Sequence, residues 1–301
     1  MNETKRQDLP PGLWIVATPI GNLMDITSRA CKALAEAELI FCEDTRRTGI
    51  LLSSLGIARN QRLERLDAHT PLNRLQAWIQ EMKMGGKFAL VTDAGTPAVS
   101  DPGSVFVALA HEAEIQVTPI PGASAVLALL SVSGFQETAF AFRGFFPRKT
   151  LERKREIQLA QSSPLASICT WFESPLRILD TLTLVQHELP EARIIVAKEL
   201  TKLHEKLFLG SINKVLEQIE TELNQIGSVG EWCFGIQFSS RDSVAREEAL
   251  DTLREAWVKA LRCLAECGVS ASEAVRKVSQ HFGVPKKLVY QESLSVFGKK
   301  T

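Results

Sequence analysis

KFALVTDAGTPAVSDPG, residues 87–103, joins an apolar run to a loop of small and polar residues. The run from Lys87 to Thr92 predicts a buried β-strand. Gly, Pro, Ser, Thr and Asp dominate the residues that follow, up to Gly103. Packing alone does not demand this composition, whereas exposed backbone amides and short hydroxyls suit a small polar ligand. The stretch therefore predicts a ligand-binding loop at the end of a strand.

Strand-like and helix-like segments alternate on both sides of this loop. Apolar runs predict further strands at 13–18, 38–42 and 115–119, and helical spacing predicts helices at 26–37, 46–55, 72–84, 102–113 and 122–132. Such alternation indicates a largely parallel sheet with helices on both faces. Ligands bind outside the carboxyl ends of the strands in such sheets, and each loop discussed below follows a strand.

The second half of the chain alternates less strictly, which favours a mixed sheet. Strands are predicted at 139–145, 165–172, 193–197, 206–209 and 231–238, with helices at 150–161, 175–187 and 212–223. Beyond residue 243 the pattern is helical only, and its last two helices resemble a helix-turn-helix. A length of 301 residues suits two domains and a small third part. We expect a polar tail (1–12), two α/β domains (13–135 and 136–242) and a helical segment (243–301).

The bulk composition excludes some protein classes. The formal net charge is zero, with 35 basic and 35 acidic residues, which argues mildly against nucleic-acid binding but leaves room for a local basic patch. The six cysteines are scattered without zinc-ligand spacing, so we expect no metal site. The N-terminus lacks an apolar signal core and no long apolar run occurs, so a cytoplasmic location is expected.

Three other loops could carry chemistry. The first, Thr18–Asn22, contains Pro19 and Gly21, and either a structural turn or close approach of a ligand explains it. The second, Cys42–Gly49, contains Asp44 and Thr45, either of which could cap the next helix, while its Arg46 and Arg47 also suit phosphate. The third, Pro119–Ala125, has small residues at a helix N-terminus.

A basic cluster follows residue 147. Five basic residues lie within eight positions, with Glu152 as the only acid: Arg148, Lys149, Arg153, Lys154 and Arg155. Either a solvated helix face or a patch that follows a phosphate backbone would account for them. The phenylalanines of 140–146 could stack on bases, although their alternation along a strand favours a core position for most of them.

Several common signatures are absent. The sequence has no GxxxxGK[ST] loop, no strand–GxGxxG–helix fingerprint, no HExxH and no GxSxG. Ordinary P-loop NTPases, Rossmann dehydrogenases, zincins and the common hydrolases are therefore excluded, as are methyltransferases of the Rossmann type.

Seven motifs in order resemble those of the small-subunit ribosomal RNA methyltransferase I family, part of the tetrapyrrole-methylase superfamily. They are VATPIGNLMDIT (16–27), FCEDTRRTG (41–49), VTDAGTPAVSDPG (91–103), PIPGASA (119–125), FRGFFPRK (142–149), FESPLR (172–177) and KELTKLHEK (198–206). The match extends from about Leu13 to Gly210. Chance agreement at seven ordered motifs is remote.

The resemblance implies two α/β domains of the tetrapyrrole-methylase type with a cofactor cleft between them, followed by the helical segment. It implies S-adenosylmethionine as cofactor, 2′-O-methylation of a cytidine in the decoding region of 16S ribosomal RNA, and a homodimer. The cofactor contacts that it implies are Gly95, Thr96, Pro97, Val99, Ser100, Gly122, Ser124, Ala125 and Phe172. We add Pro19 and Gly21 of the loop Thr18–Asn22 to these expected contacts. The RNA contacts expected are Arg46, Arg47, Arg148, Lys149, Arg153, Lys198 and Lys202.

Methyl transfer from a sulfonium requires the nucleophile, the methyl carbon and the sulfur to be collinear. A ribose hydroxyl is a weak acid, so a nearby base assists. Asp93 and Glu173 are the expected catalytic carboxylates, although either could instead bind the ammonium group of the cofactor. Two other functions fit the pattern: a small-molecule methyltransferase of the same fold, and a ligand-sensing DNA-binding regulator.

Overall fold

The computed structural model describes residues 9–58, 60–162, 166–238 and 241–297, and residues 241–251 by their backbone only. Residues 1–8 of the expected polar tail lie outside the described residues. The chain forms two compact units. The first comprises the described residues up to Gln136, with Phe142–Phe146 and Thr170–Ile236; the second comprises Glu137–Ala141 and the described parts of 147–169 and 237–301. Each is described by itself.

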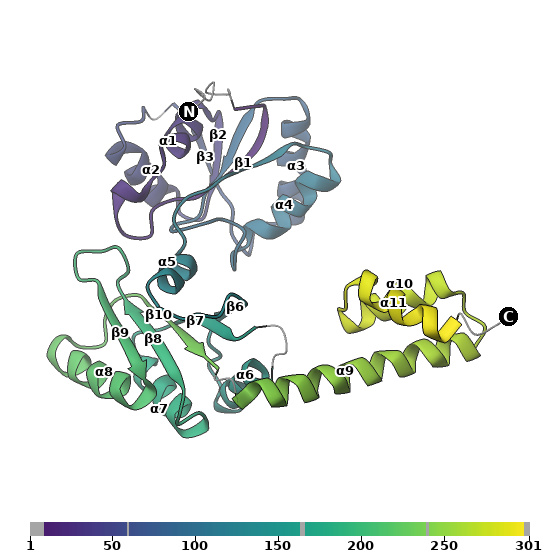
Figure 1. Cartoon of the computed structure of the whole chain (residues 1–301). Coiled ribbons are helices and arrows are strands. Elements are labelled where there is room, and N and C mark those ends of the chain that lie inside the picture. The colour runs from purple at the N-terminus through teal and green to yellow at the C-terminus, as the bar shows by residue number, and fades with distance from the viewer. Residues whose placement is uncertain (1–8, 59, 163–165, 239–240, 298–301) are drawn as a thin grey trace, which may run out of the picture. The chain divides into compact units, whose positions relative to one another are not determined.

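A parallel sheet of five strands organises the first part of the chain (Figure 1). Its order is β3-β2-β4-β1-β5, and every pairing described between these strands is parallel. The strands are β1 (Gly12–Val16), β2 (Leu39–Cys42), β3 (Arg62–Arg65), β4 (Lys87–Leu90) and β5 (Val117–Ile120). The prediction of a parallel α/β sheet is confirmed. Sequence analysis did not predict β3, because three of its four residues, RLER, are charged.

Helices cover both faces of this sheet, because both faces of the strands are apolar. Alternate residues of β1, β2 and β4 enter two separate cores. One core receives Trp14 and Ile40 and packs against α1 (Ser28–Glu36) and α2 (Thr45–Ser54). The other receives Phe41 and packs against α3 (Leu72–Lys83) and α4 (Gly103–Glu112). Two packed faces hold the carboxyl ends of the strands rigidly.

A second five-stranded sheet follows, in the order β6-β7-β10-β8-β9. Its strands are β6 (Phe140–Phe145), β7 (Ile168–Glu173), β8 (Arg193–Lys198), β9 (Lys206–Ser211) and β10 (Trp232–Gln237). The pair β8 and β9 is antiparallel. The helices of this part are α5 (Ala125–Ser131), α6 (Thr150–Gln161), α7 (Ile178–Glu188) and α8 (Ile212–Ile226). Leu129 of α5 packs with Ile195 and Cys233 in the core of this sheet.

Three helices end the chain: α9 (Arg241–Glu266), α10 (Ala271–Phe282) and α11 (Lys286–Phe297). Ser270 caps α10 by accepting a hydrogen bond from the amide of Glu273. Gly283 ends α10 in the left-handed conformation, at φ 66°, which glycine adopts without strain. Trp257, Val275 and Val289 contribute one residue from each helix to a shared core. Within the described part of the chain, no helix is both long and apolar enough to span a membrane.

Candidate functional site

Three loops at the carboxyl ends of β1, β4 and β5 are tied together by hydrogen bonds. Thr18 and Gly95 pair through their backbones, with N···O distances of 2.9 and 3.1 Å. The Thr18 hydroxyl also donates to the carbonyl of Thr92 at 3.1 Å. The Thr96 hydroxyl donates to the carbonyl of Ala123 at 3.2 Å. The loops predicted as separate ligand-binding segments therefore form one wall.

The loop after β4 adopts an unusual backbone conformation that one side chain maintains. Ala98 and Ser100 both have φ of 64°, a conformation that residues other than glycine adopt only at a cost. The carboxylate of Asp101 accepts hydrogen bonds from the amides of Ala98 at 2.7 Å and Gly103 at 2.8 Å. Desolvation by burial raises the pKa of Asp101, and these two amides oppose the shift. Asp101 thus holds the loop in its strained shape.

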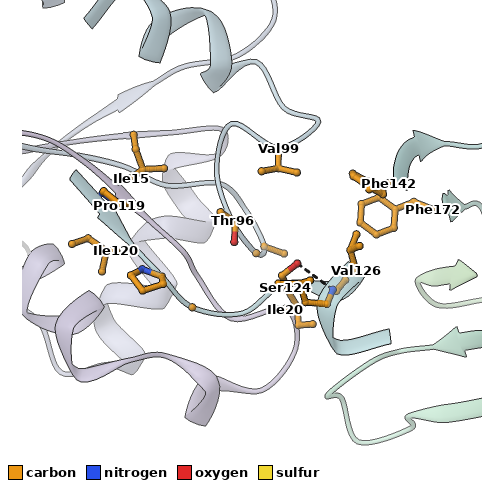
Figure 2. A pocket seen from close by; sticks show the side chains of 16 residues that line it. Ile15, Ile20, Thr96, Val99, Pro119, Ile120, Ser124, Val126, Phe142 and Phe172 are labelled. Carbon is orange, nitrogen blue, oxygen red and sulfur yellow. Dashed lines mark hydrogen bonds between the residues drawn. The ribbon is translucent and has the colours of Figure 1, made fainter. Parts of the chain in front are cut away.

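The first cavity of the site has a volume of about 410 Å³ and a largely apolar lining (Figure 2). Ile15, Pro119 and Ile120 line it from the first sheet, and Phe142 and Phe172 line it from the second. Small residues surround the start of α5, where the Ser124 hydroxyl accepts from the amide of Leu127 at 3.5 Å. The size falls within the range of small-molecule sites, roughly 300–1,000 Å³. The lining suits a ligand with a flat apolar ring.

A second cavity of about 470 Å³ shares part of this wall and is more polar. Thr96, Val99, Ala125 and Phe172 line both cavities. The second cavity alone is also lined by Glu43, Arg47, Asp93, Ser100, Asp101, Phe145, Glu173 and Trp232. An apolar cavity thus adjoins one with charged groups, an arrangement that can bring two ligands together.

Asp93 has the features of a proton acceptor in the second cavity. Its Oδ2 lies 3.1 Å from Nη1 of Arg47, while its Oδ1 is buried without a hydrogen-bond partner among the described residues. Desolvation raises the pKa of Asp93; the Arg47 charge opposes this, and the charges of Glu43 and Asp44 add to it. A carboxylate with a raised pKa and one unused oxygen is suited to taking a proton from a ligand.

Glu173, the other expected catalytic carboxylate, is already bonded at both oxygens. Its side chain is fully buried. Oε1 accepts from the Ser174 amide at 2.6 Å and pairs with Arg177, and Oε2 accepts from the Thr181 hydroxyl at 2.7 Å. These bonds orient the turn after β7 that borders the cavity. The geometry therefore favours a positioning role for Glu173.

Four of the basic residues expected to contact RNA lie in the first unit, and their surroundings differ. Arg46 is 88% exposed and pairs with Asp44 at 2.9 Å, which raises the pKa of Arg46. Arg47 is 69% exposed at the second cavity. Lys202 pairs with Glu199 at 2.9 Å and is partly buried.

Lys198, by contrast, is 3% exposed and pairs with Glu222 at 2.7 Å, so it does not face solvent. Its Nζ also lies 5.5 Å from the ring centre of Trp232, which lines the second cavity.

The Lys198–Glu222 pair leads to a stability prediction. Glu222→Ala should lower the free energy of unfolding by about 3–5 kcal/mol, because it leaves the buried Lys198 ammonium without its partner. Glu220 lies exposed on the same helix, and Glu220→Ala should change stability by less than about 0.5 kcal/mol. Urea unfolding followed by circular dichroism measures both. Equal effects of the two substitutions would contradict a structural role for the pair.

The other expected residues divide between the cavities and their surroundings. The cofactor residues that line a cavity are Gly95, Thr96, Val99, Ser100, Gly122, Ser124, Ala125 and Phe172. Pro97 is buried and lines neither cavity, and Pro19 and Gly21 also lie outside both linings. A Cβ at Gly21 would lie 2.3 Å from Cγ of Lys202, so this glycine permits close packing of two loops. Arg148, Lys149 and Arg153 belong to the second compact unit.

Sequence analysis missed several residues of the two linings. Ile15, Ile20 and Trp232 are apolar and were assigned to strands or turns without a site role. The signal available was their position: each lies at an end of a strand or beside a loop already singled out. An apolar residue there can face either a core or a cavity, and the sequence pattern does not distinguish the two.

Known proteins resemble this chain in sequence and in fold. A family model described as "Tetrapyrrole (Corrin/Porphyrin) Methylases" matches residues 12–216. "Ribosomal RNA small subunit methyltransferase I" of Synechocystis sp. is 37% identical over 289 residues, covering 94% of this chain and 98% of the relative. The protein of the same name from Haemophilus influenzae is 36% identical, covering 96% and 98%. The chain is also similar to a crystal structure of diphthine synthase, with 14% sequence identity and a TM-score of 0.57. This match covers 78% of this chain and 94% of the diphthine synthase chain.

Proposed function

Because the chain belongs to the tetrapyrrole methylase family, and within it to the ribosomal RNA small subunit methyltransferase I family, we propose that it methylates the 2′-hydroxyl of a cytidine in the decoding region of 16S ribosomal RNA. Its methyl donor is S-adenosylmethionine. The single observation that carries the proposal is the pairing of an apolar cavity with an adjoining cavity that contains Asp93 and Arg47.

The first cavity fits the cofactor. Ile15, Ile20 and Ile120 would enclose the adenine ring with apolar surface, while the backbone of residues 94–96 would reach its polar groups. Gly122 lets the loop after β5 lie against β1, since a Cβ there would be 2.9 Å from Cβ of Ala17. The small Ser124 and Ala125 leave the start of α5 open to a ligand. We assign cofactor binding to these residues together with Thr96, Val99 and Phe172.

When bound, S-adenosylmethionine would supply an electrophilic methyl group on its sulfonium. Asp93 takes the proton of the attacking ribose hydroxyl at Oδ1, which has no other partner in the described structure. Arg47 holds the Asp93 carboxylate at Oδ2 and offers its remaining N–H groups to a phosphate. Glu173 orients the turn after β7 through Ser174 and Arg177.

RNA binding is assigned to the exposed basic residues. In the first unit these are Arg46 and Arg47, and in the second unit they are Arg148 and Lys149. We also assign RNA contact to Arg153 and Lys202, which are partly buried. Lys198 is left out because its ammonium is buried against Glu222. A homodimer would supply a larger RNA surface than this chain of zero formal net charge offers. We place the protein in the cytoplasm, where ribosomal subunits are its substrate.

The proposal is tested by supplying labelled S-adenosylmethionine with either small ribosomal subunits or a tetrapyrrole precursor. The subunits come from cells that lack the gene for this protein, so that its target is unmodified. Label in the RNA supports the proposal. Label in the tetrapyrrole alone would replace it by a small-molecule methyltransferase of the same fold.

A further inference from the structure

Phe145 is an aromatic residue that lies outside the hydrophobic core. It is the last residue of β6, lines the second cavity and remains 67% exposed. Its neighbour Phe146, in contrast, is 1% exposed and packs on Trp171 and Phe234. Burial therefore explains Phe146 but leaves Phe145 without a packing reason for an aromatic side chain.

Neighbouring rings hold Phe145 in place. Its ring centre lies 5.4 Å from that of Phe172, edge to face, and Phe172 lies 4.9 Å from Phe142. Phe142 and Phe172 lie side by side at the first cavity, as Figure 2 shows. Phe172 lines both cavities, so it connects the cofactor site to the exposed ring. Phe145 is thus a fixed aromatic platform beside the place where methyl transfer would occur.

The polar groups of the same cavity complement such a platform. Arg47 presents a guanidinium that is 69% exposed, and Asp93 presents a carboxylate oxygen without a partner. A nucleotide carries a flat base, a phosphate and a ribose hydroxyl, and proteins bind these by aromatic stacking, by arginine and by hydrogen bonding, respectively. The second cavity offers all three within about 470 Å³.

We propose that the second cavity is a nucleoside subsite in which the base of the target nucleotide stacks on Phe145. The proposal rests on the proposed function and deepens it, because it requires the target nucleotide to leave its neighbours in the RNA and enter the cavity. A ribose held in a continuous RNA stack would have its hydroxyl outside the cavity that contains Asp93. Enzymes that act on a base within a duplex extrude the target nucleotide into a pocket, and the same movement would bring a ribose hydroxyl into this cavity.

Stacking depends on an aromatic face more than on the identity of the base. Phe145 should therefore govern how well the nucleotide is positioned. Phe145→Ala is expected to lower kcat/KM for RNA roughly 5- to 150-fold, the loss associated with one base–aromatic stack. Phe145→Trp should keep most of the activity. The affinity for S-adenosylmethionine should stay within about twofold, because Phe145 lines only the second cavity.

Phe140→Ala is the matched control. Phe140 lies on the same strand, is 45% exposed and lines neither cavity, so its removal should leave kcat/KM for RNA unchanged. The experiment measures methyl transfer to undermethylated small subunits, cofactor affinity by calorimetry, and melting temperature for the wild type and the three variants. A selective loss in Phe145→Ala that Phe145→Trp restores is the expected result.

Wild-type kinetics for Phe145→Ala would overturn the subsite and leave the proposed function intact. An equal loss in Phe145→Trp and Phe145→Ala would also overturn it, since an aromatic face would then not be what matters. Unchanged kinetics with an altered oligomeric state would assign the ring to a subunit interface instead. Failure of the wild-type protein to methylate the subunits would contradict the proposed function itself, and the subsite with it.

Discussion

Replacing Asp93 by Asn should lower kcat for methyl transfer by roughly 10²- to 10⁴-fold, the usual contribution of a general base. The side chain keeps its size and its place beside Arg47 but loses the ability to accept a proton. Cofactor affinity should be retained, because Asp93 lines the second cavity and not the first. Single-turnover transfer from labelled S-adenosylmethionine to small subunits measures the effect.

Asp44→Asn is the control for this substitution. Asp44 is a neighbouring acid that pairs with Arg46 and lines neither cavity. Its replacement should leave kcat near the wild-type value. Near-wild-type kcat in Asp93→Asn would contradict the assignment of Asp93 as the base. Glu43, which lines the same cavity, would then be the next carboxylate to replace.

The pH dependence follows from the same carboxylate. The base acts only when deprotonated, so kcat should fall as the pH drops through the pKa of Asp93, which desolvation raises above its ordinary value. The Arg47 charge lowers this pKa. Arg47→Gln should therefore move the acidic limb of the pH profile to higher pH, and Asp93→Asn should remove that limb. An acidic limb unchanged in both variants would assign it to another group.

Gly122→Ala should weaken S-adenosylmethionine binding by about 5- to 150-fold, equivalent to the 1–3 kcal/mol cost of overpacking a close contact. The new Cβ would lie 2.9 Å from Cβ of Ala17, so the loop that lines the first cavity must shift away from β1. Calorimetric titration gives the affinity, and the melting temperature reports any general loss of stability.

The structure also supplies a compensating change for Gly122→Ala. Ala17→Gly removes the atom that clashes, and the next contacts, to the Ala17 carbonyl oxygen and carbon, are 3.4 and 3.7 Å. The double variant Ala17→Gly/Gly122→Ala should therefore recover most of the cofactor affinity. If it binds as weakly as Gly122→Ala alone, close packing of this loop is not what shapes the cofactor cavity.

The fold was largely predictable because its strands are apolar on both faces and its loops are rich in glycine and proline. The apolar run predicted at 87–92 contains β4, and the loop after it lines the site. The strand β3 was missed because three of its four residues, RLER, are charged, and it is the pairing with β2 that makes them a strand. Periodicity detects apolar faces, whereas a polar edge strand depends on its neighbour.

The roles of individual site residues were harder to predict, because they depend on partners far away in the sequence. Lys198 and Arg47 are both basic residues near a strand end. Lys198 is buried and pairs with Glu222, whereas Arg47 remains exposed at a cavity. Asp93 and Glu173 are both acids after a strand, and only the first has an unused oxygen. Spacing along the chain places such residues at the correct edge of a sheet, but it does not determine which neighbours occupy their polar atoms.

The central claim is that this chain methylates a ribose hydroxyl of a cytidine in small-subunit RNA. The most direct test treats undermethylated small subunits with the protein and labelled S-adenosylmethionine, digests the RNA to nucleosides and separates them by chromatography. The account predicts that the label elutes as 2′-O-methylcytidine and that Asp93→Asn slows its appearance by roughly 10²- to 10⁴-fold. Label on a base, on another nucleoside, or no label in the RNA would contradict the account.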